Sequence, residues 1–117
     1  MLRAWRATVN SWNGLAFAVR SEQAIREELA ALILSVPLVW LIGTTPARRI
    51  EMVAVILLLL VVELLNTAIE KLADRLTTDH DPQIGRVKDM GSAAVGVALI
   101  IAGVVWLFAL AECLGWV

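Results

Sequence analysis

The clearest fold signal in the chain is the stretch MGSAAVGVALIIAGVVWLFALA, residues 90–111, which contains no charged side chain. A helix rises about 1.5 Å per residue, so 22 residues suffice to cross a hydrocarbon layer about 30 Å thick. Small residues, among them Gly91, Ser92 and Gly96, recur along this stretch and indicate close packing against another helix. We therefore expect a transmembrane helix over residues 90–114.

The composition of the whole chain points to the same class of protein. Of the 117 residues, 60% are hydrophobic and 18% are charged, and the mean hydropathy is +0.80. A chain this short cannot bury so much apolar surface in a core of its own, so we expect an integral membrane protein. Ten Lys and Arg stand against eleven Asp and Glu, and this balance argues against nucleic acid as a partner. The lone Cys113 lies in an apolar segment and is interpreted as a packing residue.

Two further segments predict transmembrane helices. Residues 29–45 carry no charge over 17 positions, and Thr44-Thr45-Pro46 predicts a turn that sends the next helix back antiparallel over residues 47–76. Residues 1–28 mix Arg with Trp and aliphatic side chains, which is typical of an amphipathic helix that lies in the membrane interface. No linker or repeat divides the chain, so we predict a single domain over residues 1–117.

The distribution of basic residues predicts the orientation in the membrane. Four Arg precede the first span, two lie in the first turn, and four Lys and Arg surround the second connection. The positive-inside rule then places the N-terminus and the second connection in the cytoplasm and the C-terminus outside. The first long apolar stretch starts only near Leu29 and no small-residue cleavage motif follows it, so a secretory signal peptide is not expected.

Polar side chains interrupt the second predicted span along one face. At about 100° per residue, Glu63, Asn66, Glu70 and Asp74 fall on a stripe less than a quarter-turn wide. Glu63 is expected below the membrane surface and Glu70 at it. An ionised carboxylate facing lipid costs at least about 2 kcal/mol, so Glu63 must face protein, a polar ligand or water, or else be protonated.

This stripe has three interpretations. Glu63 could pair with Asn66 or a neighbouring helix solely for packing, and Asp74 could be a solvated helix end or a partner of Arg75 or Lys71. A small oligomeric transporter could use the carboxylates as an ion or proton relay. An enzyme could hold a divalent cation with paired carboxylates and use the deeper one as a general base.

Three further features bear on the enzyme interpretation. Lys88-Asp89 precedes the third span at the level of the stripe, which favours an enzyme, although the pair could also be an interfacial anchor. The phosphate loop and the Gly-rich, HRD and DFG motifs of soluble kinases are absent, so a nucleotide site must be built differently. His80 has no Cys or second His nearby, so it is interpreted as a solvated loop residue and not as a zinc ligand.

The strings ELLNTAIE at residues 63–70, Asp74-Arg75 and GRVKDMGSAAV at 85–95 resemble the prokaryotic diacylglycerol kinase family, which includes the undecaprenol kinases. SWNGL at residues 11–15 and the order of the three spans extend the likeness over nearly the whole chain. The resemblance implies an all-α membrane fold, a homotrimeric bundle of one interfacial helix and three transmembrane helices per chain. It also implies active sites shared between chains at the cytoplasmic face of the bacterial inner membrane, where γ-phosphoryl transfer from MgATP converts diacylglycerol to phosphatidic acid.

The resemblance also implies roles for individual residues. Glu63 looks like the catalytic base, organised by Asn66, and Glu22 with Glu70 looks like the Mg²⁺-binding pair. Glu28 and Asp74 look like supporting carboxylates. The positions that match nucleotide contacts are Arg3, Asn10, Glu22, Glu70, Asp79, His80, Asp81, Lys88 and Asp89. The positions that match the lipid substrate are Arg3, Glu63 and Ser92.

The choice of lipid follows from the motif at residues 85–95. This motif is closer to the diacylglycerol kinases than to the undecaprenol kinases, so diacylglycerol is the predicted acceptor. Residue chemistry alone does not identify the lipid. Undecaprenol is therefore the alternative substrate, and a small oligomeric membrane transporter is the alternative of a different class.

Overall fold

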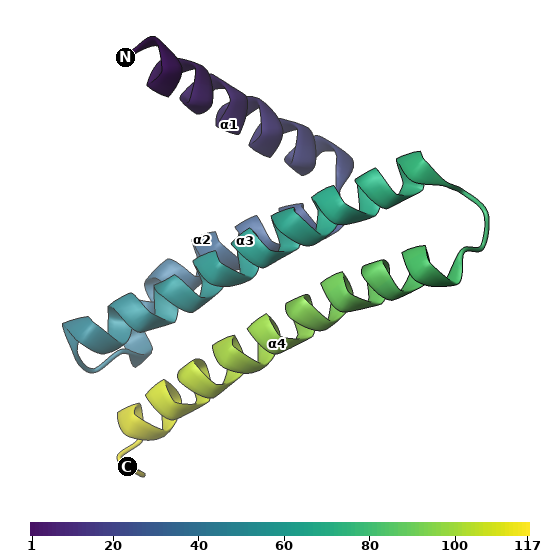
Figure 1. Cartoon of the computed structure of the whole chain (residues 1–117). Helices are drawn as coiled ribbons and strands as arrows, with labels where there is room; N and C mark the ends of the chain where they lie inside the picture. The colour runs from purple at the N-terminus through teal and green to yellow at the C-terminus, as the bar shows by residue number, and fades with distance from the viewer.

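The computed structural model describes residues 1–117, which form four α-helices and no strand. Their bounds are α1 Leu2–Ser21, α2 Gln23–Ile42, α3 Pro46–Leu76 and α4 Pro82–Cys113. Helix α3 packs along α4 and α2, whereas α1 leans away from this bundle and contacts mainly α2 (Figure 1). The prediction of an all-helical fold is confirmed.

Helices α3 and α4, which follow the two antiparallel turns, begin with the same kind of N-cap. The Thr45 hydroxyl accepts a hydrogen bond from the backbone N–H of Arg48 at 3.1 Å, and Pro46 follows as the first helical residue. Asp81 Oδ1 likewise accepts from two backbone N–H groups of α4, and Pro82 follows it. Such caps satisfy N–H groups that have no partner inside the helix, while proline fixes the backbone for the first turn.

The break between α1 and α2 falls at Glu22, whose backbone is extended. Arg26 closes this break because its Nη1 donates to the carbonyls of Val19 at 2.8 Å and Arg20 at 3.1 Å. These carbonyls belong to the last turn of α1 and lack helical partners. The interfacial region predicted over residues 1–28 thus contains one continuous helix and the start of the next.

Two helices, α3 and α4, are long and apolar enough to cross a membrane. Helix α2 fails this test because Arg26, Glu27 and Glu28 lie near its start and leave a shorter uncharged run. Helices α2 and α4 begin at Gln23 and Pro82, before the predicted spans, because charged turns extend both helices beyond their apolar parts. Two of the three predicted spans therefore meet the requirements of length and hydropathy.

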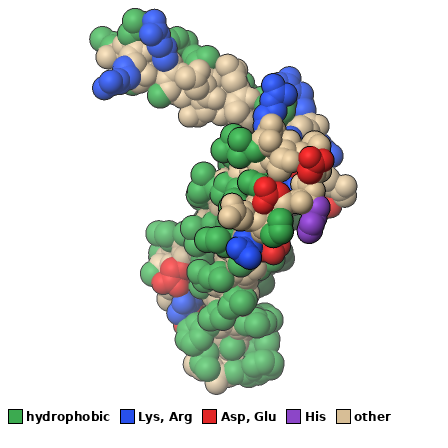
Figure 2. All heavy atoms as spheres, turned by 45° about the vertical axis from the view of Figure 1, so that its right-hand side comes forward, with side chains coloured by type: hydrophobic (Ala, Val, Ile, Leu, Met, Phe, Trp, Pro, Cys, Tyr) green, Lys and Arg blue, Asp and Glu red, His purple; other side chains and the backbone are tan.

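The surface of the bundle is mostly apolar. Only 15 of 117 residues are buried, and large hydrophobic side chains remain exposed along α2, α3 and α4. Figure 2 shows apolar side chains over much of the bundle, a group of acidic, basic and histidine side chains on the right of the view, and smaller charged groups at the top left and lower left. An apolar surface this extensive must be covered by lipid or other protein, as expected for an integral membrane protein.

The buried core is small and lies near the α2–α3 turn. Val39, Met52 and Ala109 bring α2, α3 and α4 together there, and Trp106 Nε1 donates to the Met52 carbonyl at 3.1 Å. Cys113, interpreted from sequence as a packing residue, is instead exposed because it is the last residue of α4. Its Sγ lies 3.9 Å from the Leu41 carbonyl oxygen.

Candidate active site

The polar stripe of α3 is fixed at its centre by Asn66. Asn66 is buried and its Nδ2 donates to Glu70 Oε1 at 3.3 Å, while Glu63 is half-buried and Glu70 is exposed. Asn66 therefore bonds Glu70 and makes no bond to Glu63, contrary to the packing interpretation of Glu63 as its partner. The amide couples the surface carboxylate to the interior of the bundle.

Gly91 of α4 has no side chain, and this leaves room for the Asn66 amide between α3 and α4. A Cβ atom at residue 91 would overlap Asn66 Oδ1, which is buried and has no hydrogen-bond partner. At this level α4 therefore has no room for a larger residue unless the Asn66 side chain moves. The small residue singled out in the third span has this packing role.

Replacing Gly91 by alanine is expected to turn the Asn66 side chain and break its bond to Glu70. Leaving the buried Asn66 amide without its partner lowers the free energy of unfolding by about 1 kcal/mol relative to Gly96→Ala. Gly96→Ala is the matched control, because a Cβ atom at Gly96 has no atom within 4 Å. Unfolding of both variants in detergent micelles, followed by circular dichroism, checks this; equal stability would contradict the packing role.

Helix α2 adds carboxylates beside the α3 stripe. Glu22 Oε1 lies 2.7 Å from Lys71 Nζ, and this ion pair ties the start of α2 to α3. The charges of Glu22 and Glu70 also act on the Glu63 carboxylate. Lys71 is not recognisable as a site residue from sequence, because its partner Glu22 is 49 positions away along the chain.

Glu28 is the fourth carboxylate of this region. Burial of its side chain, and secondarily the charge of Glu63, raise the pKa of Glu28 to about 7. Its Oε2 is buried without a hydrogen-bond partner. Glu28 thus adds a fourth carboxyl group to the region of Glu22, Glu63 and Glu70, in which Glu22 is paired with Lys71.

The α3–α4 turn forms a polar hollow next to the stripe. Lys88 Nζ lies 2.5 Å from Asp74 Oδ1, so Asp74 pairs across the turn and not with Arg75 or Lys71 of its own helix. The hollow has a volume of about 350 Å³. It is lined by Asp74, Thr77, Thr78, Asp79, His80, Asp81, Ile84, Gly85 and Lys88. The predicted nucleotide positions of this loop therefore lie together, with Asp81 also capping α4.

Within a single chain, the other predicted site residues lie apart from the α3 stripe and the hollow at the α3–α4 turn. Arg3 and Asn10 are exposed on α1, which points away from α3 and α4 (Figure 1), and neither bonds to a residue of the stripe. Asp89 and Ser92 are exposed on α4 without a side-chain hydrogen bond. A complete site would need these residues to be supplied from elsewhere.

The carboxylates suit Mg²⁺ shared with a substrate better than a closed metal cage. No group of three or more His, Cys, Asp and Glu side chains is placed to hold a metal ion. Mg²⁺ usually takes one or two carboxylates and completes its coordination with water and substrate phosphates. Glu22 and Glu70 offer two carboxylates of the kind that this mode of binding uses, with Glu22 paired to Lys71 and Glu70 bonded to Asn66 in this structure.

Comparisons with known proteins agree on one family. The family described as prokaryotic diacylglycerol kinase matches residues 9–110. The diacylglycerol kinase of Haemophilus influenzae is 40% identical over 86% of this chain and 85% of its own length. Those of Escherichia coli K12 and Pseudomonas aeruginosa are 38% and 40% identical, each over 89% of this chain and 85% of the relative. The matched residues include every candidate site residue except Arg3.

Proposed function

This chain belongs to the prokaryotic diacylglycerol kinase family, and from that premise we propose that it transfers the γ-phosphoryl group of ATP to diacylglycerol and forms phosphatidic acid. The observation that carries the proposal is the α3 stripe. In it, Glu70 is exposed and bonded to Asn66, and Glu63 is half-buried two turns of helix farther from the α3–α4 turn. Seven residues of helix, about 10 Å, separate Glu63 from Glu70. A lipid hydroxyl can reach the deeper carboxylate from the bilayer while ATP approaches from water.

Glu63 is the proposed catalytic base. Its carboxylate accepts the proton of the diacylglycerol hydroxyl as that oxygen forms a bond to the γ-phosphorus of ATP. The bond from phosphorus to the β,γ-bridging oxygen breaks, and ADP leaves. Asn66 holds Glu70 beside this path, and Ser92 contacts the lipid substrate. Positioning and charge neutralisation are the main contributions that phosphoryl transfer requires from a protein.

The hollow at the α3–α4 turn is the proposed entrance for ATP. Lys88 exchanges Asp74 for phosphate oxygens, since a phosphate offers the ammonium group a stronger partner than an exposed carboxylate. Glu22 and Glu70 hold Mg²⁺, which when bound neutralises charge on the phosphate oxygens. Lys71 then has to release Glu22. The remaining proposed nucleotide contacts are Arg3, Asn10, Asp79, His80, Asp81 and Asp89.

Asp89 gives the reason to propose sites shared between chains. Lys88 and Gly91 both face α3, as their contacts with Asp74 and Asn66 show. At about 100° per residue, Asp89 lies about 160° around α4 from Gly91 and so faces away from its own site. We propose that it serves a neighbouring chain in a homotrimer, whose formation also covers exposed apolar faces.

Mixed assemblies test this sharing. Chains carrying Glu63→Gln and chains carrying Asp89→Asn should each be inactive alone, yet random mixing in a trimer restores about one quarter of wild-type activity if each site takes the two residues from different chains. Each variant mixed with itself is the control. Continued inactivity after mixed trimers are demonstrated by native mass spectrometry would contradict shared sites.

The proposed placement in the membrane follows the charges. Helices α2, α3 and α4 span the inner membrane of a bacterium over residues 29–45, 47–76 and 90–114, in one domain covering residues 1–117. Helix α1 lies in the interface, and the charged end that contains the α3–α4 turn faces the cytoplasm. The basic residues before α2 and around that turn support this orientation.

Lipid phosphorylation by the purified chain tests the proposed function. In mixed micelles with diacylglycerol and MgATP, we expect phosphatidic acid to accumulate with time and enzyme concentration. A transporter that uses Glu63 as a relay would instead pass ions in vesicles without ATP and form no phosphatidic acid. Absence of phosphorylation across several detergents and lipids would overturn the proposal.

A further inference from the structure

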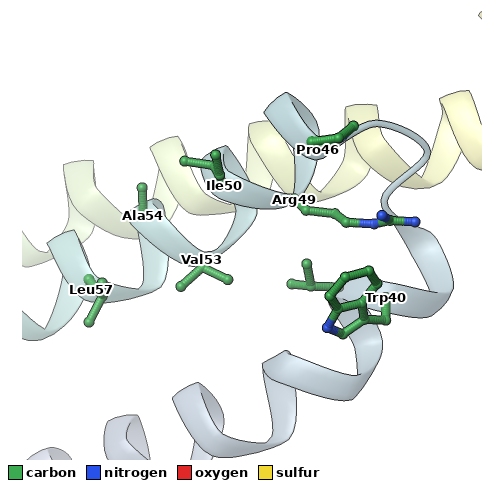
Figure 3. Close-up of a pocket in the computed structure, with 8 residues that line it drawn as sticks. Trp40, Pro46, Arg49, Ile50, Val53, Ala54 and Leu57 are labelled. Atoms are coloured by element: carbon green, nitrogen blue, oxygen red, sulfur yellow. The ribbon is translucent and has the colours of Figure 1, made fainter.

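An apolar groove lies between α2 and α3 at the end of the bundle opposite the α3 stripe. It has a volume of about 530 Å³ and is lined by Trp40 and Arg49 together with apolar side chains such as Ile50, Val53 and Leu57 (Figure 3). Arg49, Val53 and Leu57 recur at helical spacing, so the groove follows α3 for about 12 Å. Its volume and apolar lining suit an acyl chain.

Arg49 is held at the mouth of this groove. Its Nε donates to the Gly43 carbonyl at 3.0 Å, and its guanidinium carbon lies 4.5 Å from the centre of the Trp40 ring (Figure 3). A Cβ atom at Gly43 would clash with the Arg49 stem and with the Val39 carbonyl, so glycine makes room for the arginine. Both terminal nitrogens of Arg49 remain without a hydrogen bond or ion pair.

The adjacent Arg48 forms ion pairs with the carboxylates at this end of the molecule. Arg48 Nη1 lies 2.6 Å from Glu51 Oε2, and its Nε lies 3.3 Å from Glu112 Oε1, which also accepts from Thr44 at 2.8 Å. The other acidic residues lie between Glu22 and Glu28 or between Glu63 and Asp89, towards the opposite end. A second copy packed in parallel would therefore bring only Glu51 and Glu112 to this end, and both are already paired with Arg48.

We propose that Arg49 and Trp40 form a binding site for one anionic phospholipid. The lipid phosphate accepts hydrogen bonds from the two terminal nitrogens of Arg49, and one acyl chain fills the groove along Val53 and Leu57. Trp40 lies at headgroup depth, where tryptophan is favoured, and its ring holds the guanidinium plane toward the lipid. A net negative headgroup is selected because the unpaired cation at the membrane surface attracts anionic lipids. This site is separate from the proposed catalytic centre and does not depend on the proposed activity.

Contact quenching of Trp40 fluorescence tests the site. The full chain is placed in vesicles of phosphatidylcholine that contain a minor fraction of dibrominated phosphatidylglycerol or of dibrominated phosphatidylcholine. The signal of Trp40→Phe is subtracted to isolate Trp40. We expect the anionic lipid to be enriched about fivefold over the zwitterionic lipid at Trp40.

Variants separate this site from general attraction to the membrane. Arg49→Gln should reduce the enrichment to about onefold, whereas Arg49→Lys keeps a charge and should retain part of it. Arg6→Gln, on α1, is the matched control and should leave it unchanged. Equal quenching by both lipids in the wild-type chain would overturn the proposal, as would full enrichment in Arg49→Gln. If neither lipid quenches Trp40, another chain covers the groove and the proposal fails.

Discussion

Replacing Glu63 by glutamine is expected to lower kcat at least about 100-fold with little change in KM for ATP. Glutamine keeps the size of the side chain and can still hydrogen-bond, but it cannot accept the proton of the lipid hydroxyl. The proposed nucleotide site at the α3–α4 turn contains none of the atoms that change. Initial rates of phosphatidic acid formation over a range of ATP concentrations measure both parameters.

Glu27→Gln is the matched control for this experiment. Glu27 is exposed on α2, bonds only Gln23 of its own helix and lies outside the proposed site, so its turnover should remain close to wild type. Size-exclusion chromatography verifies that both variants keep the wild-type oligomeric state. If Glu63 served packing alone, a neutral amide in an apolar layer would be tolerated. Near-normal turnover in an intact Glu63→Gln oligomer would therefore remove Glu63 from catalysis.

Glu70→Gln is expected to raise the Mg²⁺ concentration needed for half-maximal activity roughly 10- to 100-fold. A hard divalent cation prefers a charged carboxylate oxygen, and the amide of glutamine binds it more weakly. High Mg²⁺ should restore part of the activity of Glu70→Gln and none of that of Glu63→Gln. A Mg²⁺ titration of both variants measures this difference. Equal recovery would show that the two carboxylates do not divide into a base and a metal ligand.

Hydropathy was sufficient to predict α4, because its long uncharged run has few alternatives to a membrane-spanning helix. The uncharged run of α3 covers only residues 52–62, so the prediction of its full length also used the helical spacing of its side chains. Thr45 and Pro46 also predicted the turn that the structure contains. The start of α2 was not predictable in this way. It depends on Arg26 bonding to the last carbonyls of α1, and such a contact between two helices leaves no periodic signal.

The candidate site was predictable where it lies on a single helix. The spacing of Asn66 and Glu70 placed them on one face of α3, and their side chains do bond. Sequence placed Lys88 at the level of the stripe, and the structure pairs it with the stripe residue Asp74. The ion pair between Glu22 and Lys71 was not predicted, because the two residues lie on different helices. The direction of Asp89 likewise becomes meaningful only once the face of α4 that packs on α3 is known.

Competition between two lipid acceptors tests the central claim most directly. Purified chain in mixed micelles receives MgATP with diacylglycerol and undecaprenol at equal mole fractions, and the initial rates of formation of both phosphorylated lipids are measured together. The account predicts that phosphatidic acid is the main product and that Glu63→Gln abolishes its formation. Undecaprenyl phosphate as the main product would contradict diacylglycerol as the substrate, and the absence of both products would contradict a lipid kinase.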